Sequence, residues 1–432
     1  MSTTTASKPA TSAAKPTNYK QAMFVIGSMF FILGFVTWLN SLLIPFLKQA
    51  CELTDFVAYF VAFAFYISYF VMAIPSSMIL KKIGFTKGMS LSLIVMAIGA
   101  LIFVPAAQTR SYPIFLAGLF TTAAGMTLLQ AAVNPYITII GPIESAAQRM
   151  SIMGICNKLA GMIGIFVLSL FLFKDSEALS AKIATLSGAE KELELDLLAS
   201  RVIVPYIIMA AVLIVLAVVV RKSSLPEPAA DDETVDHGPD PFGRTSAFQI
   251  PYLVLGVLCL FLYVGVEVLA IDSLTLYGES QGLTKEIASK LGIFSLIAFT
   301  AGYLIGVALV PKVVSQKTAF VICAVLGIVF TIGALLTSGN VSIGFMVALS
   351  FAHSLMWPGI WPLAINKLGK FTKFGSALLI MGIAGGAILP IVYGAMADAM
   401  GDRQLPYIIM IPCYLFMVYY ALSGSKKGLP QD

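Results

Sequence analysis

The chain has 432 residues, of which 59% are hydrophobic and only 11% are charged, whereas a water-soluble domain carries roughly 25% charged residues. So few charges cannot cover a water-facing surface of this length, which argues against a soluble fold and points to lipid as the solvent. The net charge of +5 is spread along the chain and does not form one basic face, which argues against nucleic-acid binding.

Residues 1–20 are rich in Thr, Ser, Ala and Lys and predict a disordered tail. Apolar runs of about 20 residues, the length that a membrane-spanning helix needs, then recur along the whole chain. They predict an all-α polytopic membrane protein with about twelve spans, at 22–47, 57–80, 88–107, 112–140, 146–173, 201–220, 250–277, 287–310, 318–337, 341–366, 374–398 and 405–422.

Two connections between these spans are long. Residues 174–200 alternate charged residues with Leu and Ala at helical spacing, and residues 221–249 are Pro-rich and acidic, as is typical of a flexible linker. The linker separates a six-helix half at 21–220 from a second at 250–423, which is followed by a tail at 424–432. Lys and Arg concentrate in the loops that share a side with both termini, so we expect the termini and the linker to be cytoplasmic.

The two halves show weak self-similarity. GFVTWLNSLL in the first span resembles VEVLAIDSLT in the seventh, and LKKIGFTKG after the second span is echoed by VPKVVSQK after the eighth. In transporters built from parallel repeats, the substrate site lies near the midplane of the membrane, between the halves.

Three ionisable residues fall inside predicted spans, namely Lys158 in the fifth and Glu267 and Asp272 in the seventh. A charge at the bilayer centre costs about 2.5–3.5 kcal/mol on insertion scales, so these residues need partners, a wet cavity or a function. Glu267 and Asp272 point about 140° apart on a helix and cannot both face one narrow site. We expect one acid, preferably Asp272, to bind or titrate with a coupling cation and the other to pair with Lys158 or another polar group. The alternative is a buried ion pair that only holds the halves together.

Carboxamides recur in the predicted spans. Gln130 and Asn134 in the fourth span share one helix face, and their paired donors and acceptors suit the vicinal hydroxyls of a sugar. Asn40 in the first span and Asn157 in the fifth are similar isolated amides. Helix–helix hydrogen bonding is the alternative role for Gln130 and Asn134, and tight helix packing is the alternative for Asn157.

Aromatic residues form a second pattern. His353, Trp357 and Trp361 follow one another at four-residue steps in the tenth span, near Pro358 and Pro362, and predict one stripe. Indole faces stack on the C–H faces of pyranoses, so we expect at least one of these tryptophans to contact substrate, with Trp38 as a weaker candidate. His353 is a candidate proton relay, although a buried, hydrogen-bonded core histidine is the favoured interpretation.

Other motifs carry no function. Residues 278–282 match G-x-S-x-G, but that motif needs a strand–turn–helix context and a histidine partner. The five cysteines are scattered without a C-x-x-C spacing, which suggests neither a zinc site nor a disulfide framework. We therefore expect a protein that is not an enzyme and has no cofactor.

Five motifs stand out along the chain, namely LNSLLIPFLK, LLQAAVNPYI, NKLAGMIG, FLYVGVEV and LMWPGIWPLAINKLGKFTKFGSALLIMGIAGGAILP. Together they resemble the fucose–galactose–glucose symporter family, a bacterial branch of the major facilitator superfamily. The resemblance covers nearly the whole chain, and the Trp-containing tenth span looks like the subgroup associated with glucose or N-acetylglucosamine. It implies the major facilitator fold and proton- or sodium-driven sugar import by alternating access.

The resemblance extends to particular residues. Gln130 and Asn134 match the substrate-facing motif of the family, and Asn157 matches an asparagine of its fifth span. Many members have an aspartate after the first-span asparagine, whereas Ser41 follows Asn40 here. Because Asp272 occupies the pseudo-equivalent place in the seventh span, we expect the coupling carboxylate to have moved there. Asp272, Ser273 and Thr275 would offer oxygen ligands to sodium, so sodium and protons both stay open.

These patterns predict a secondary active transporter that imports a hexose or N-acetylhexosamine with a cation. An uncoupled facilitator and a drug or metabolite exporter of the same fold are the alternatives. The expected partners are the sugar, the cation and the lipid bilayer, with no nucleic acid, and the expected form is a monomer in the bacterial inner membrane.

Overall fold

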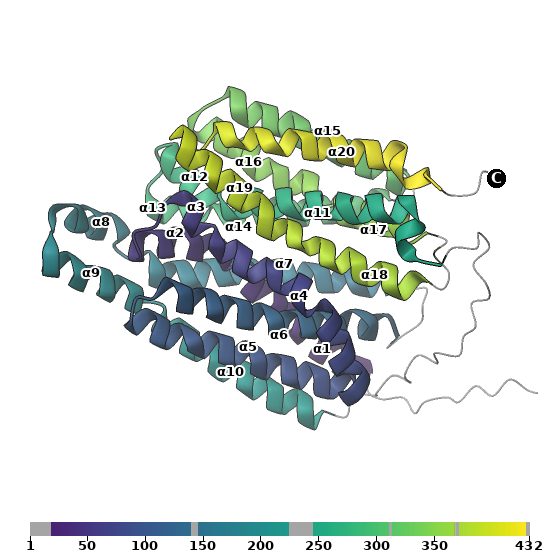
Figure 1. The fold of residues 1–432 in the computed structure, drawn as a ribbon, viewed down its shortest axis with the longest axis horizontal. Coiled ribbons are helices and arrows are strands. Elements are labelled where there is room, and N and C mark those ends of the chain that lie inside the picture. The colour runs from purple at the N-terminus through teal and green to yellow at the C-terminus, as the bar shows by residue number, and fades with distance from the viewer. Residues whose placement is uncertain are drawn as a thin grey trace, which may run out of the picture.

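The computed structural model describes residues 19–139, 146–223, 245–310, 313–366, 368 and 371–428. Its regular elements are all helices (Figure 1). Twelve helical segments in this part of the chain are long and apolar enough to cross a membrane. Lipid offers no hydrogen bonds, so a spanning segment must satisfy its own backbone groups, and a helix does so completely. The prediction of an all-α polytopic membrane protein is confirmed.

The N-terminal half comprises α1 (Tyr19–Thr37), α2 (Asn40–Ala50), α3 (Asp55–Ala58), α4 (Phe60–Ile83), α5 (Phe85–Gln108), α6 (Tyr112–Ile139), α7 (Ala146–Leu172), α8 (Ser176–Thr185), α9 (Gly188–Ser200) and α10 (Ile203–Lys222). The C-terminal half comprises η2 (Ala247–Gln249), α11 (Pro251–Asp272), α12 (Leu274–Ser280), α13 (Lys285–Ala288), α14 (Leu291–Leu309), α15 (Gln316–Leu336), α16 (Gly339–His353), α17 (Met356–Ile365), α18 (Thr372–Met381), η4 (Gly382–Ala384), α19 (Gly385–Met400), η5 (Leu405–Ile409), α20 (Met410–Leu422) and η6 (Gly424–Lys426).

Several predicted spans are interrupted helices. The first span breaks at Trp38 and Leu39, between α1 and α2, and the seventh breaks at Ser273, between α11 and α12. The two breaks fall in the two segments that the sequence repeat aligns. The predicted sixth span, 201–220, corresponds to α10, and the charged helix α9 precedes it within one helical segment over Gly188–Lys222.

Most of the predicted tail at 1–20 and of the linker at 221–249 lies outside the described residues, whereas the structure describes residues 424–428 of the predicted tail at 424–432. Where the structure describes their edges, these are helical. Residues 19–20 begin α1, residues 221–222 end α10, and residues 247–249 and 424–426 form short helices. Helices α1 and α10 thus extend two residues into the segments predicted as tail and linker, within the usual variation of helix ends.

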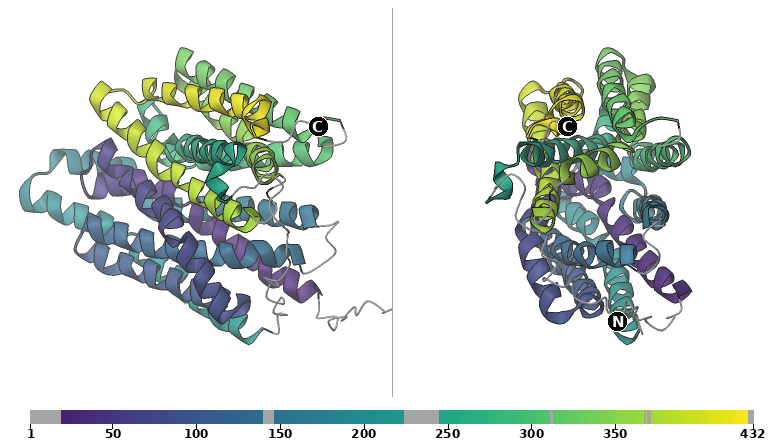
Figure 2. Two further views of the ribbon diagram at one scale, coloured as in Figure 1. Left: turned by 45° about the vertical axis from the view of Figure 1, so that its right-hand side comes forward. Right: turned by 90° about the vertical axis from the view of Figure 1, so that its right-hand side faces the viewer.

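The two halves lie side by side, with the purple-to-teal N-terminal half below the green-to-yellow C-terminal half in Figure 1. Across the junction, α4 packs on α18 and α19, α3 packs on α19, and α7 packs on α14. Figure 2 shows the same two bundles from two further sides. We call the end that carries α2, α3, α8, α12 and α13 the far end, and the opposite end, near Tyr19 and Gly428, the terminal end.

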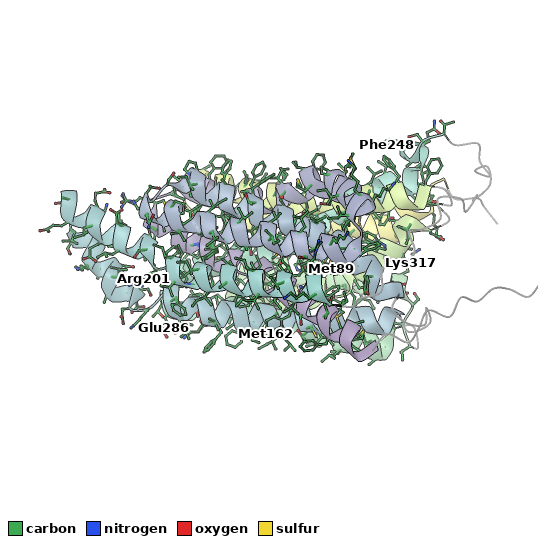
Figure 3. The ribbon with its side chains drawn as sticks, turned by 90° about the horizontal axis from the view of Figure 1, so that it is seen from below. Met89, Met162, Arg201, Phe248, Glu286 and Lys317 are labelled. Atoms are coloured by element: carbon green, nitrogen blue, oxygen red, sulfur yellow. The ribbon has the colours of Figure 1, made fainter. Side chains whose placement is uncertain are left out.

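The outer surface of the bundle is apolar along the helices and charged at the ends. Exposed apolar side chains include Phe166, Val215 and Leu304, which are 49%, 62% and 55% exposed. Figure 3 shows Arg201 and Glu286 toward one end of the bundle and Lys317 toward the other. This distribution matches a helix bundle whose belt faces lipid and whose ends face water.

Two glycines allow close helix contacts on either side of the junction. A Cβ atom on Gly34 would overlap the backbone of Asn157, and one on Gly385 would overlap the carbonyl of Phe261. The first contact joins α1 to α7, and the second joins α19 to α11. Small residues permit such approach in membrane bundles, and here they fix the helices that surround the centre.

Candidate functional site

A cavity of about 250 Å³ lies between the halves near the middle of the helices. Its lining includes residues from α1, α4, α6, α7, α11, α14, α17 and η4 and from the break between α1 and α2. The lining residues are Thr37, Trp38, Tyr66, Tyr69, Gln130, Asn157, Lys158, Tyr263, Val264, Glu267, Val268, Phe299, Tyr303, Trp357 and Ile383. This volume lies just below the roughly 300–1,000 Å³ of sites for drug-sized ligands, so a monosaccharide-sized molecule is the appropriate scale.

Lys158 joins the two halves inside this cavity. Its Nζ lies 3.7 Å from Oε1 of Glu267, 4.2 Å from the centre of the Trp38 ring and 3.9 Å from the centre of the Phe299 ring. Lys158 and Trp38 belong to the N-terminal half, whereas Glu267 and Phe299 belong to the other. A carboxylate and two aromatic faces together stabilise the ammonium group away from bulk water.

Two amides of the N-terminal half also line the cavity. The Nε2 of Gln130 donates to the hydroxyl of Tyr69 at 3.0 Å, which fixes the direction of the amide. The indole N–H of Trp38 donates to Oδ1 of Asn157 at 3.5 Å. Asn134, which the sequence places on the same face as Gln130, is not among the lining residues.

The predicted stripe of His353, Trp357 and Trp361 is wrong. The helix breaks between α16 and α17, so His353 ends one helix and the tryptophans lie on the next. His353 is fully buried, and its Nε2 lies 2.7 Å from the hydroxyl of Tyr414. It is not a lining residue itself, but its ring packs edge-on against that of Tyr263, which lines the cavity, with ring centres 6.3 Å apart. Trp357 does line the cavity, and Trp361 stacks against it with ring centres 5.5 Å apart.

Asp272 has a different environment from Glu267. It ends α11 at the helix break, is 1% exposed and is not among the cavity-lining residues. Its Oδ2 is buried without a hydrogen-bond partner in the described part of the chain. The neighbouring Ser273 hydroxyl lies 2.6 Å from the hydroxyl of Tyr407.

The amide of Asn40, at the equivalent break of the first half, shares this isolation. Asn40 is 1% exposed, and its Nδ2 has no hydrogen-bond partner among the described residues. Close by, the hydroxyl of Thr275 donates to the carbonyl of Ser41 at 3.3 Å, across the junction between the halves. The segments next to the two breaks therefore contact each other, and each carries a buried polar atom without a hydrogen-bond partner among the described residues.

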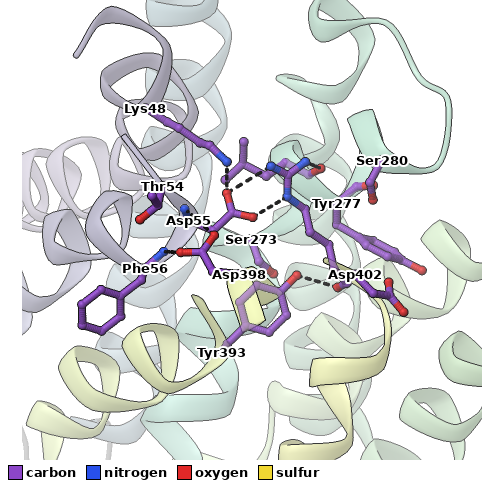
Figure 4. Close-up of polar contacts among 12 residues, drawn as sticks. Lys48, Thr54, Asp55, Phe56, Ser273, Tyr277, Ser280, Tyr393, Asp398 and Asp402 are labelled. Carbon is purple, nitrogen blue, oxygen red and sulfur yellow. Dashed lines mark hydrogen bonds and ion pairs between the residues drawn. The ribbon is translucent and has the colours of Figure 1, made fainter. Parts of the chain in front are cut away.

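A polar network closes the far end (Figure 4). Arg403 donates through Nε and Nη2 to the two carboxylate oxygens of Asp55, at 2.7 and 3.0 Å, and Lys48 pairs with the same carboxylate. The oxygens of Asp398 accept from the backbone N–H groups of Asp55 and Phe56, at 2.9 and 2.7 Å. Since Arg403 and Asp398 belong to the C-terminal half and Asp55 to the other, the network holds the halves together.

A second cavity, of about 240 Å³, lies beside this network and is lined in part by Lys48, Glu279, Lys285 and Arg403. Lys285 donates to Oε1 of Gln49 at 2.8 Å, again between the halves. Burial raises the pKa of Glu279 above its ordinary value, although the positive charges of Lys285, Arg403 and Lys48 oppose this shift. Glu279 also belongs to the G-x-S-x-G match, whose first three residues form the end of helix α12, so the strand that the motif needs is not there.

The sequence did not predict the phenols of the cavity or the far-end network. Tyr66, Tyr69, Tyr263 and Tyr303 line the cavity, and their positions within apolar spans were the only available signal. Asp55 and Arg403 lie in loops or at helix ends, where charged residues are ordinary. Their pairing across 348 positions depends on the packing of the halves.

The fold and the cavity together define a membrane transporter, in which two helix bundles surround a central polar chamber. A model of the Major Facilitator Superfamily matches residues 26–386. The chain is 32% identical to a "Glucose/galactose transporter" of Brucella abortus over 96% of this chain and 97% of that protein. It is 28% identical to an "L-fucose-proton symporter" of Escherichia coli, over 96% and 95% of the two chains.

Solved structures agree with this comparison. The crystal structure of the fucose–proton symporter FucP of E. coli superimposes with a TM-score of 0.70 and 26% identity, over 94% of this chain and 98% of that one. The chain belongs to the major facilitator superfamily and, within it, to the fucose–galactose–glucose symporter family. It is a multi-pass membrane transporter and not an enzyme.

Proposed function

We propose that the chain imports a monosaccharide, a hexose or N-acetylhexosamine, together with a sodium ion or a proton. The central cavity carries this proposal, because amide, carboxylate, ammonium and indole groups from both halves converge on a space of about 250 Å³. Amides and carboxylates bind hydroxyl groups, and indole rings stack on sugar C–H faces. The names of the two relatives support a sugar substrate.

Asp272 is the proposed coupling carboxylate. It is deeply buried and has one oxygen without a hydrogen-bond partner among the described residues. A buried carboxylate without a counter-ion is costly, so binding of a proton or sodium ion would stabilise it. The adjacent hydroxyls of Ser273 and Thr275 are potential further oxygen ligands.

Alternating access follows from the arrangement of the halves. The far-end network joins the halves at one end of the central cavity, so sugar exchange at that end requires Asp55 to separate from Arg403. With cytoplasmic termini in a bacterial inner membrane, the far end is periplasmic and this state is closed to the outside. A monomer supplies the whole cavity. Labelling of single cysteines near the termini in inverted and right-side-out vesicles tests the orientation.

Counterflow in proteoliposomes tests the function. Purified protein should exchange one or a few members of a panel of hexoses and N-acetylhexosamines, and a sodium or pH gradient should drive accumulation. Exchange without accumulation under either gradient would identify an uncoupled facilitator. Failure to exchange any sugar, combined with export of unrelated compounds, would contradict the proposal.

A further inference from the structure

Two deep acids on α11 differ in what surrounds them. Glu267 lines the central cavity, and its side chain is 13% exposed. Asp272 is 1% exposed and is not part of the lining. Because five residues separate them, the two side chains leave the helix in directions about 140° apart. The two carboxylates therefore face different surroundings, and only that of Glu267 is open to the central cavity.

Glu267 already has a counter-ion that belongs to the chain. The ammonium of Lys158 lies 3.7 Å from its Oε1 and is held between the rings of Trp38 and Phe299. A carboxylate whose charge is balanced by a fixed ammonium gains little from a transported cation. Asp272 differs, since we find no ion-pair partner for it within the described ranges and its Oδ2 is unbonded there.

Glu267 nevertheless keeps acceptor capacity toward the cavity. A carboxylate has about four lone-pair sites, and the 3.7 Å separation from Lys158 exceeds the length of a direct hydrogen bond. Gln130 of the other half lines the same cavity, and its amide is oriented by Tyr69. Trp357 supplies an aromatic wall, with its ring centre 6.4 Å from that of Tyr263 on α11.

We propose that Glu267, held in place by Lys158, binds the sugar hydroxyls from the C-terminal half and determines which hydroxyl pattern the transporter accepts. This inference rests on the proposed sugar transport and assigns ion coupling to Asp272 alone. Sugar binding then links the halves through Gln130 on one side and Glu267 on the other. A sugar that lacks the bonded hydroxyl leaves Glu267 with an unused acceptor in a desolvated site, and such sites reject analogues strongly.

The first test compares Glu267→Gln with Asp272→Asn in proteoliposomes. Counterflow needs sugar binding but no ion gradient, whereas accumulation needs both. Glu267→Gln should raise the half-saturating sugar concentration in counterflow by about 10-fold or more, because hydrogen bonds to charged groups are the strong ones. Asp272→Asn should lose accumulation while its counterflow affinity changes less. Leu258→Ala, at a 43% exposed position of α11, should match the wild type in both assays.

A specificity test separates binding from support of the fold. Wild-type counterflow is competed with the 2-, 3-, 4- and 6-deoxy analogues of the best sugar, and the same series is repeated with Glu267→Gln. At one position or at two adjacent positions, the wild type should reject the deoxy analogue, and the variant should lose most of that discrimination. A merely structural effect would weaken all analogues by the same factor.

Glu267→Gln leaves Lys158 without its counter-ion, which can prevent folding. The double variant Lys158→Gln/Glu267→Gln removes both charges and therefore leaves no unpaired ion. It is tested in the same counterflow series, and it should lose the same discrimination between the sugar and its deoxy analogues. The inference is overturned if Glu267→Gln, or the folded double variant, keeps wild-type discrimination in counterflow. If the wild type exchanges no sugar in the panel, the proposed function itself fails.

Discussion

Gln130 shows how a single polar residue is prepared for binding. Its amide was predicted from the sequence as a sugar ligand, and the structure places it at the cavity with its Nε2 bonded to Tyr69 at 3.0 Å. A fixed amide presents its carbonyl oxygen without losing much rotamer freedom on binding. Its role in sugar binding stays a prediction.

Removing this amide should weaken sugar binding. We expect Gln130→Ala to raise the half-saturating sugar concentration in counterflow by about 10-fold, because a buried partner is lost at a cost of about 1–3 kcal/mol. Tyr69→Phe should have a smaller effect of about 2- to 5-fold, since only the orienting hydrogen bond is lost. An effect of Tyr69→Phe larger than that of Gln130→Ala would contradict this order.

A second residue-scale prediction concerns pH. Burial raises the pKa of Glu279, against Lys285, Arg403 and Lys48, in the state with a closed far end. Opening hydrates this carboxyl and returns its pKa toward 4.5, the ordinary value. The closed state therefore binds the proton more tightly, and it loses stability as the pH rises from the ordinary pKa through the raised pKa.

Spin labels at Glu177 on α8 and Ile287 on α13 report this equilibrium. The population with a long inter-label distance should grow as the pH rises through that window. Glu279→Gln should remove this component of the pH dependence. If the variant responds to pH as the wild type does, another group is responsible.

At the scale of elements, close contacts between helices fix the walls of the cavity. Gly385 begins α19, and a Cβ there would overlap the carbonyl of Phe261 on α11. Gly344, within α16, has nothing within 4 Å of a Cβ. The sequence shows both glycines but does not show which one lies at a contact.

Gly385→Ala should therefore destabilise the protein by about 1–3 kcal/mol, the usual cost of overpacking. Gly344→Ala should be neutral or stabilising by up to about 1 kcal/mol, because alanine favours the helix. Denaturant unfolding in detergent, followed by tryptophan fluorescence, measures both. An equal decrease in the free energy of unfolding of the two variants would contradict a stabilising role for the close helix contact at Gly385.

At the scale of the whole molecule, the far-end network joins the two halves at one end of the bundle. Arg403 binds Asp55 with two hydrogen bonds across the halves, and Asp398 caps the start of α3 from the opposite half. A carboxylate at a helix N-terminus also interacts favourably with the helix dipole. These contacts hold the halves together at the far end in this structure, so their loss should favour opening at that end.

Arg403→Gln should shift the equilibrium toward a far-end-open state by about 5- to 150-fold, the range of a 1–3 kcal/mol coupling. The Glu177 and Ile287 spin-label pair measures the shift. Arg201→Gln is the matched control, since Arg201 bonds the carbonyls of Leu172 and Lys174 within one half. A shift of equal size in the Arg201→Gln control would contradict a specific role of Arg403 in keeping the far end closed.

The sequence by itself was sufficient to predict that the chain lies in a lipid bilayer, that its fold is all-α and which family it belongs to. Apolar runs in lipid must form helices, so composition and periodicity suffice for that step. The deep positions of Lys158, Glu267 and Asp272 also followed from the sequence, because charged residues are rare within apolar spans and are easily identified there.

Only the tertiary structure decided which of these groups meet. It paired Lys158 with Glu267, placed His353 behind the cavity wall beside Tyr414 and joined Asp55 to Arg403. Each outcome depends on helix breaks and on helix contacts between residues that are distant in the chain. A periodic pattern gives the face of one helix, but the partner of that face is set by packing across the two halves.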